Sequence, residues 1–123
     1  MRNRYVLQGL GVVIVTVISL QDAWTASSQD ITPRKVEVTA KRFSFQPAEI
    51  TLKKGDPVTL VFRSEDVTHG IKFKEFNIES EIKKDALKEI SFTPDQTGDF
   101  VGHCAHFCGE GHGSMVLTLH VTE

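Results

Sequence analysis

Along residues 36–121, apolar and polar positions alternate in short stretches that are separated by turn residues. The alternating stretches are "VEVTA" at 36–40, "AEITL" at 48–52, "EISF" at 89–92, "FVGHC" at 100–104 and "MVLTLHV" at 115–121. A period of two residues is typical of strands that bury one face. The stretch "VTLVF" at 58–62 is β-branched and apolar enough for a central strand, whereas "GIKFKEFNIESEI" at 70–82 alternates in one phase and then in a second.

These stretches predict an all-β fold, an antiparallel β-sandwich. Glycine and proline mark the turns between them, as in "KKGDP" at 53–57 and "TPDQTGD" at 93–99. A helical period longer than one turn is expected only in "KKDALKE" at 83–89. A sandwich of this size is small, so a bound metal ion or a disulfide would help to stabilise it.

The N-terminal segment has a different pattern. Arg2 and Arg4 precede a mostly apolar run of 15 residues, 6–20. A membrane-spanning helix needs about 20 residues, so the run favours an export signal, with a short membrane anchor as the alternative. We therefore predict a signal peptide or short anchor at 1–26, a linker at 27–33 and a single domain at 34–123. In either case the domain is expected to be periplasmic or otherwise extracytoplasmic, soluble or attached to the membrane through residues 6–20.

Composition narrows the class of protein. The 123 residues allow one domain and little more, and the content of 40% hydrophobic and 24% charged residues is that of a globular chain. The net charge of -2, without a basic patch, gives no reason to expect a nucleic-acid partner.

Candidate chemistry gathers in "GHCAHFCGEGHGSM" at 102–115, which contains both cysteines of the chain, three histidines and a methionine. Cys104 and Cys108 alone would suggest a disulfide in an oxidising compartment. His112 and Met115 follow at short spacing, and thiolate, imidazole and thioether together are the ligand set of copper electron-transfer sites. Zinc makes little use of methionine, and an iron–sulfur cluster would normally need more thiolates.

A copper site of this kind needs a second histidine, and "SEDVTHGIKF" supplies His69 before a predicted strand. Three classes of function follow from these residues. The first is an electron-transfer protein with two copper ions, and the second is a mononuclear copper protein using His69, Cys108, His112 and Met115. The third, a copper-delivery protein, is disfavoured because Met1 and Met115 are the only methionines. An enzyme acting alone is also disfavoured, since such a site keeps no open coordination position for a substrate.

Residues 34–123 resemble the copper-binding domain of cytochrome c oxidase subunit II, a member of the cupredoxin superfamily. The segments "SEDVTHG", "CAHFCGEGHGSM" and "FSFQPAEITLKKGDPVTL" carry the resemblance. It implies a Greek-key cupredoxin-like sandwich, a dinuclear copper A centre, and a redox partner such as a cytochrome c or a haem-copper oxidase subunit. It also implies the roles of six residues: Cys104 and Cys108 bridge both copper ions, His69 and His112 each bind one, Met115 is a weak axial ligand, and His106 contributes its backbone carbonyl.

The chain departs from this family at several points. His106 stands where the family commonly has a glutamate that reaches a magnesium site, and a histidine cannot serve a hard cation in that way. The only tryptophan, Trp24, lies in the leader, and the leader offers at most one apolar segment where the standard subunit has two. An oxidase subunit and a stand-alone exported electron carrier therefore both remain open. Asp66 is expected either to orient the His69 ring or to form a turn, and His103 and His120 are expected to face solvent.

Overall fold

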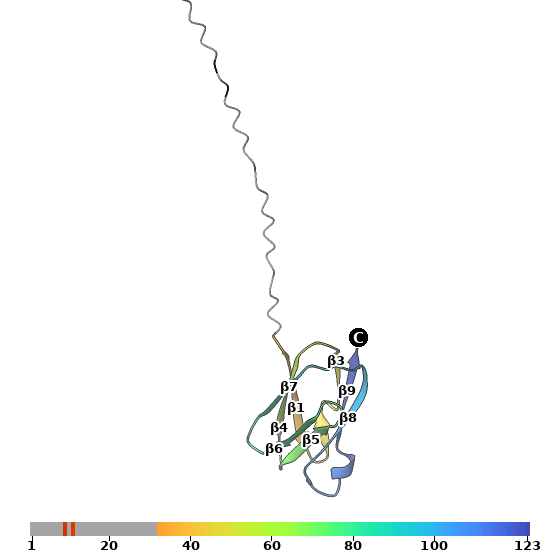
Figure 1. Ribbon diagram of the computed structural model, residues 1–123. Coiled ribbons are helices and arrows are strands. Elements are labelled where there is room, and N and C mark those ends of the chain that lie inside the picture. The colour runs from red at the N-terminus through yellow and green to blue at the C-terminus, as the bar shows by residue number, and fades with distance from the viewer. Residues whose placement is uncertain (1–8, 10, 12–31) are drawn as a thin grey trace, which may run out of the picture.

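The computed structural model describes Gly9, Gly11 and residues 32–123, so the predicted leader and linker lie almost entirely outside the described residues. Within 32–123 the chain forms two packed β-sheets (Figure 1), which confirms the predicted all-β sandwich. Among the residues described, no helix is long and apolar enough to cross a membrane.

The strands are β1 (Arg34–Lys41), β2 (Ser44–Gln46), β3 (Glu49–Lys53), β4 (Val58–Ser64), β5 (His69–Phe73), β6 (Ile78–Ile82), β7 (Lys88–Phe92), β8 (Gly98–His103) and β9 (Val116–Thr122), with one 3₁₀ turn, η1 (His112–Ser114). A 4-stranded sheet has the order β2-β1-β4-β7, and a 5-stranded sheet has the order β3-β9-β8-β5-β6.

Both sheets are mixed, so the prediction of a purely antiparallel sandwich was wrong in this respect. β1 pairs in parallel with β4, and β3 pairs in parallel with β9. The reason is that β1 and β3 follow each other closely in the chain but belong to different sheets. Each therefore pairs with a strand farther along the chain that runs in the same direction through the same sheet, β4 for β1 and β9 for β3.

The stretch at 70–82, whose alternation changes phase, is a hairpin of β5 and β6 joined through residues 74–77. Asn77 takes a φ of 53° there, a conformation that asparagine tolerates better than most residues. The stretch at 83–89 contains no helix and leads directly into β7.

Phenylalanine side chains fill much of the core between the sheets. Phe45 and Phe62 meet edge to face with 6.4 Å between ring centroids, and Phe76 packs at 4.8 Å against Phe100. A Cβ at Gly102 on β8 would lie only 2.4 Å from the ring of Phe73 on β5. This close packing fixes β5 and β8 to each other, and these are the strands that lead into the candidate site.

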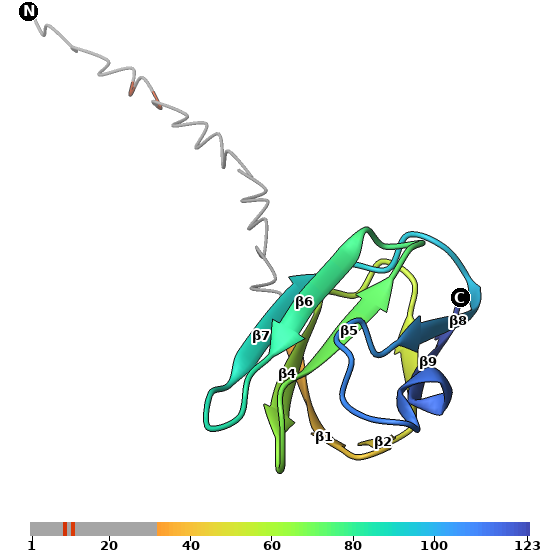
Figure 2. The ribbon, with the colours of Figure 1, turned by 90° about the horizontal axis from the view of Figure 1, so that it is seen from below.

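The connection from β8 to β9, residues 104–115, lies at the end of the sandwich opposite the C-terminus (Figures 1 and 2). His69 begins β5 and Cys104 directly follows β8. The topology thus brings two sequence segments that carry candidate ligands to one end of the 5-stranded sheet.

Candidate metal centre

Strand alternation and one turn of 3₁₀ helix orient the candidate ligands. Alternation along β8 continues past its end, so that Cys104 is buried and His103 is exposed, as predicted. A 3₁₀ helix has three residues per turn, and η1 therefore places His112 and Met115 on the same side. The backbone N–H of Cys104 donates to the carbonyl of Met115 at 3.1 Å, which closes the two ends of the loop.

The donor atoms converge around the two thiols. One donor atom from each of His69, Cys104 and Cys108 lies within 4.8 Å of the others, and all three residues are buried. The Sγ atoms of Cys104 and Cys108 are 3.8 Å apart, well beyond the S–S bond length of about 2.05 Å. The Sγ of Cys108 also lies 3.9 Å from Nδ1 of His112 and 3.9 Å from Sδ of Met115.

His106 joins this group through its backbone. The Sγ of Cys104 lies 3.2 Å from the carbonyl oxygen of His106, which is the atom that the sequence resemblance assigned to the site. The imidazole of His106 is half-buried, and its Nδ1 has no hydrogen-bond partner among the described residues. All six predicted site residues are therefore at this end of the sandwich.

The ring of His69 is held by one nitrogen and leaves the other unpaired. Its Nε2 lies 2.7 Å from Oδ1 of Asp66, while its buried Nδ1 has no partner in the described part of the chain. Burial tends to raise the pKa of Asp66, but hydrogen bonds from the Arg42 backbone N–H, from His69 and from the Val67 backbone N–H outweigh burial and lower that pKa to about 2. Asp66 is thus an ionised acceptor placed to orient the His69 ring, which was one of its two expected roles. Its Oδ1 also accepts from the backbone N–H of the next residue, Val67, at 2.7 Å.

Cys108 is a protonated thiol at neutral pH when no metal is bound. Burial, followed by the hydrogen bond and charge interaction with Cys104, raises the pKa of Cys108 to about 11, while Arg42 acts in the opposite direction. A metal ion that bound here would have to displace the thiol proton, because thiolate is the ligating form.

Three contacts of this site were not foreseen from the sequence. The Nε of Arg42 donates to the carbonyl of Cys108 at 2.8 Å, and the ring of Phe43 lies against Gly111, where an added Cβ would be 2.4 Å from the ring. An added Cβ at Gly70 would lie 2.9 Å from the backbone N of His106. The contacts at Gly111 and Gly70 require glycine at these positions. A single sequence does not show which of its glycines are required.

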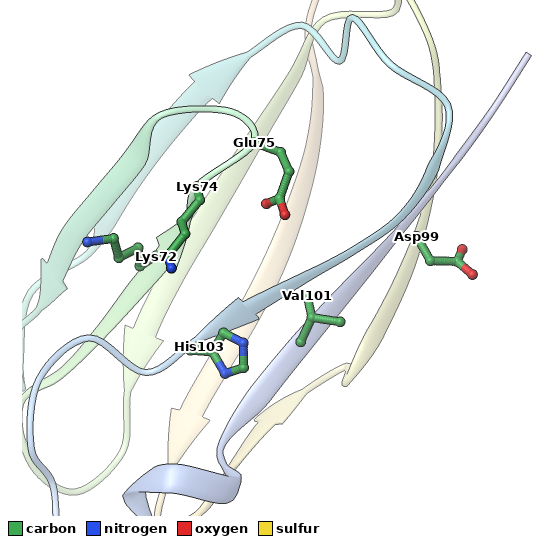
Figure 3. A pocket seen from close by; sticks show the side chains of 6 residues that line it. All are labelled: Lys72, Lys74, Glu75, Asp99, Val101 and His103. Carbon is green, nitrogen blue, oxygen red and sulfur yellow. The ribbon is translucent and has the colours of Figure 1, made fainter.

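The other histidines lie on the surface. His103 lines a groove of about 530 Å³ on the outside of the 5-stranded sheet, together with Lys72, Lys74, Glu75, Asp99 and Val101 (Figure 3). None of the converging donors is among the residues that line this groove. His120 is partly exposed and contacts Asp99 at 2.6 Å and Glu49 at 3.3 Å.

The cluster suits a soft metal ion. It combines two thiols, a buried imidazole nitrogen that has no partner in the part of the chain described, a second imidazole and a thioether. Thiolate, imidazole and thioether ligands favour copper. The residues therefore fit the copper site predicted from the sequence.

Comparisons with known proteins agree with the fold. Residues 10–117 match the family described as Cupredoxin-like domain. The nitrous-oxide reductase of Cupriavidus necator is 33% identical over 84 residues, which are 65% of this chain and 13% of that protein. Cytochrome c oxidase subunit 2 of Thermus thermophilus is 31% identical over 88 residues, which are 72% of this chain and 65% of that protein. The chain thus spans less than two thirds of the length of these relatives.

Among solved structures, the periplasmic domain of subunit II of cytochrome oxidase (CoxB) of Bradyrhizobium japonicum superimposes with a TM-score of 0.68. The sequence identity is 20%, and the match covers 73% of this chain and 84% of that one. At this identity the likeness concerns the fold.

Proposed function

This chain belongs to the cupredoxin-like family, and from that premise we propose that it is an exported copper protein that transfers electrons. The observation that carries the proposal is the convergence of His69, Cys104 and Cys108 within 4.8 Å at the buried end of the sandwich. His112 and Met115 add an imidazole and a thioether within 3.9 Å of the Cys108 sulfur. Copper bound here would supply one-electron redox chemistry.

The donor arrangement supports a dinuclear site of the copper A type. In this assignment Cys104 and Cys108 would both hold the pair of ions, and their sulfurs lie 3.8 Å apart. His69, His112 and Met115 would supply the other side-chain ligands, and His106 would supply its backbone carbonyl, which lies 3.2 Å from the Cys104 sulfur. The Nδ1 of His69 is available for this role, since Asp66 already occupies Nε2.

The protein's contribution to electron transfer is rigidity. His69 is fixed at the start of β5 by Asp66, and the loop at 104–115 is tied at both ends by the Cys104–Met115 backbone hydrogen bond. Ligands that cannot move when the charge changes keep the reorganisation energy low. Fast transfer at a small driving force then becomes possible.

We propose that electrons pass through the His112 side of the site. His69, Cys104, Cys108 and Met115 are buried, whereas His112 is partly exposed. The ring of Phe107 lies 5.7 Å from that of His112 and is 74% exposed, so a redox partner could make apolar contact close to a ligand.

A haem-copper oxidase subunit or a cytochrome c is the expected kind of partner, because the relatives include cytochrome c oxidase subunit 2. Catalysis would then belong to the partner, and this domain would be an electron-transfer module.

The location proposed for the domain is extracytoplasmic. The arginine-flanked apolar run at 6–20 supports export, and the superimposed CoxB domain is described as periplasmic. Whether the domain is released or attached through residues 6–20 depends on cleavage near residue 26. The intact mass of the exported protein distinguishes the two.

A mononuclear copper site is the second candidate, and one observation favours it. The sulfur of Cys108 lies 3.8 to 3.9 Å from three other donor atoms, among them those of His112 and Met115. Cys108, His69, His112 and Met115 would then suffice, and Cys104 would not bind metal.

The deciding experiment is a copper count on the full chain, loaded with both thiols reduced, together with an electron paramagnetic resonance spectrum of the oxidised protein. Two copper ions per chain with one electron shared between them would support the dinuclear site. One ion with a mononuclear spectrum would support the alternative, and failure to retain copper would reject both.

A further inference from the structure

The turn between β1 and β2, formed by Arg42 and Phe43, contacts both parts of the candidate metal centre. It is far from the ligand loop in sequence, since Arg42 and Cys108 are 66 positions apart. Its side chains belong to neither predicted ligand segment. If the proposed function is correct, this turn has a specific task in it.

The first contact of the turn is with the His69 side. The backbone N–H of Arg42 donates to Oδ2 of Asp66 at 2.7 Å, and Oδ1 of the same carboxylate contacts Nε2 of His69 at 2.7 Å. One carboxylate thus connects the turn to the imidazole. Because this donor is a backbone group, it is present whatever side chain stands at position 42.

The second contact is with the Cys108 side. The guanidinium Nε of Arg42 donates to the carbonyl of Cys108 at 2.8 Å. The ring of Phe43 covers the segment that follows Cys108. A Cβ added at Gly111 would lie 2.4 Å from this ring, and a Cβ added at Gly109 would lie 3.0 Å from it. The loop therefore passes directly beneath the aromatic ring, and its glycines allow this approach.

We propose that the Arg42–Phe43 turn is a positioning clamp, which holds the Cys108 segment at a fixed place relative to His69 and places a positive charge beside the metal centre. Arg42 and Phe43 are positioning residues in this proposal and do not bind the metal. The clamp should slow the release of copper. A permanent cation near the site should also favour the reduced, more electron-rich state, so Arg42 should raise the reduction potential.

The test compares three variants of the full-length, copper-loaded protein. Arg42→Gln removes the charge and the guanidinium, and Arg42→Lys keeps the charge but loses the Nε donor. Arg34→Gln is the matched control, because Arg34 also donates from its guanidinium to a backbone carbonyl, that of Thr51 at 3.1 Å. It lies at the other end of β1, roughly 25 Å away at a strand rise of about 3.3 Å per residue.

We expect Arg42→Gln to lower the reduction potential and to speed copper release to a chelator by roughly 10-fold, the lower end of the effects measured for groups that orient metal ligands. Arg42→Lys should keep the potential close to that of the wild type while releasing copper faster. Since the Arg42 side chain is exposed, the potential difference should shrink as salt is added. Arg34→Gln should match the wild type in both measurements.

Equal potentials and release rates in Arg42→Gln and Arg34→Gln would overturn the proposal. A shift of potential without faster release would overturn the clamp, and faster release without a shift would overturn the charge effect. Should Arg42→Gln not fold, Arg42→Lys and Phe43→Leu measure the clamp alone. A wild-type protein that held no copper would count against the proposed function itself, which the copper count reveals before any variant is made.

Discussion

At the scale of single residues, the candidate site separates ligands from the groups that hold them. His69 is fixed through Nε2 by an ionised Asp66, which leaves Nδ1 buried and unpaired within the described residues. Such carboxylate–histidine pairs fix the ring and its tautomer before a metal arrives. Cys108 is less prepared for metal binding, since its thiol has a pKa of about 11 and must lose its proton when a metal binds.

The two copper assignments make opposite predictions for Cys104→Ser. If both thiolates bridge two ions, this change removes one bridge, and the copper content should fall from about two ions per chain to about one, because Cys108 with His69, His112 and Met115 is a sufficient mononuclear set. If the site is mononuclear, Cys104 is not a ligand. Copper content and the electron paramagnetic resonance spectrum should then be unchanged, and that result would exclude the dinuclear assignment. The wild type has to be loaded with its thiols reduced, since a disulfide would mask the difference.

The spacing of the soft ligands made these residues visible in the sequence. Cys104, Cys108, His112 and Met115 lie within one loop, and their types alone are characteristic of copper. Arg42 could not be found in this way, because its contact with Cys108 spans 66 positions and uses a carbonyl that every residue has. Local spacing reveals ligands, whereas the groups that hold ligands depend on the tertiary fold.

At the scale of elements, burial of one face explains which strands were predictable. Alternation in β1, β3, β8 and β9 follows directly from one buried and one exposed face. β2 has only three residues, too few for a periodic pattern. The change of phase within 70–82 marks the boundary between β5 and β6, but it does not show that the two strands pair as a hairpin. Parallel pairing was missed because it depends on which sheet each strand joins, and periodicity carries no such information.

The packing of β5 against the loop at 105–106 can be tested with Gly70→Ala. The new Cβ would lie 2.9 Å from the backbone N of His106 and 3.1 Å from the backbone C of Ala105, and backbone atoms cannot move aside cheaply. We expect a loss of about 1–3 kcal/mol in the free energy of unfolding and weaker copper binding, measured by denaturant titration of the apo-protein and by chelator competition. Gly113→Ala is the control, since nothing lies within 4 Å of its added Cβ. Two variants of equal stability would mean that this contact does not constrain the loop.

Three strands of the 5-stranded sheet meet at His120, and this contact predicts a pH dependence. The hydrogen bond to Asp99 has the largest effect on the pKa of His120, and the hydrogen bond to Glu49 adds to it. Together they raise this pKa above its usual 6.5. The unfolded chain binds this proton less tightly, so the contribution to stability is complete below pH 6.5 and is lost as the pH rises through the raised pKa. The melting temperature of the apo-protein should therefore exceed that of His120→Gln at pH 5.5, and the difference should shrink by pH 9. A difference that does not change with pH would contradict these contacts of His120 with Asp99 and Glu49.

At the scale of the whole molecule, the candidate metal centre joins segments that belong to three strands of the 5-stranded sheet. His69 begins β5, Cys104 follows β8, and Met115 precedes β9. In the folded protein their donor atoms already converge, but in the unfolded chain they are far apart. A metal ion held by all of them therefore binds the folded state in strong preference to the unfolded one, and its binding energy adds to folding stability.

Copper removal should consequently lower the thermal stability of the entire domain. At a free copper concentration 100 times the dissociation constant, the stabilisation is about 2.7 kcal/mol, which for a domain of this size corresponds to roughly 10 to 20 °C in melting temperature. Thermal unfolding of the full chain with and without copper, at neutral pH and with thiols kept reduced, measures this difference. Cys108→Ser should lose most of it, because Cys108 contacts Cys104, His112 and Met115 together. Gly113→Ala, which adds a methyl group where no atom lies within 4 Å, should keep it. Equal melting temperatures of the copper-loaded and copper-free wild type would mean that the converging donors are not a native metal site, whatever their geometry.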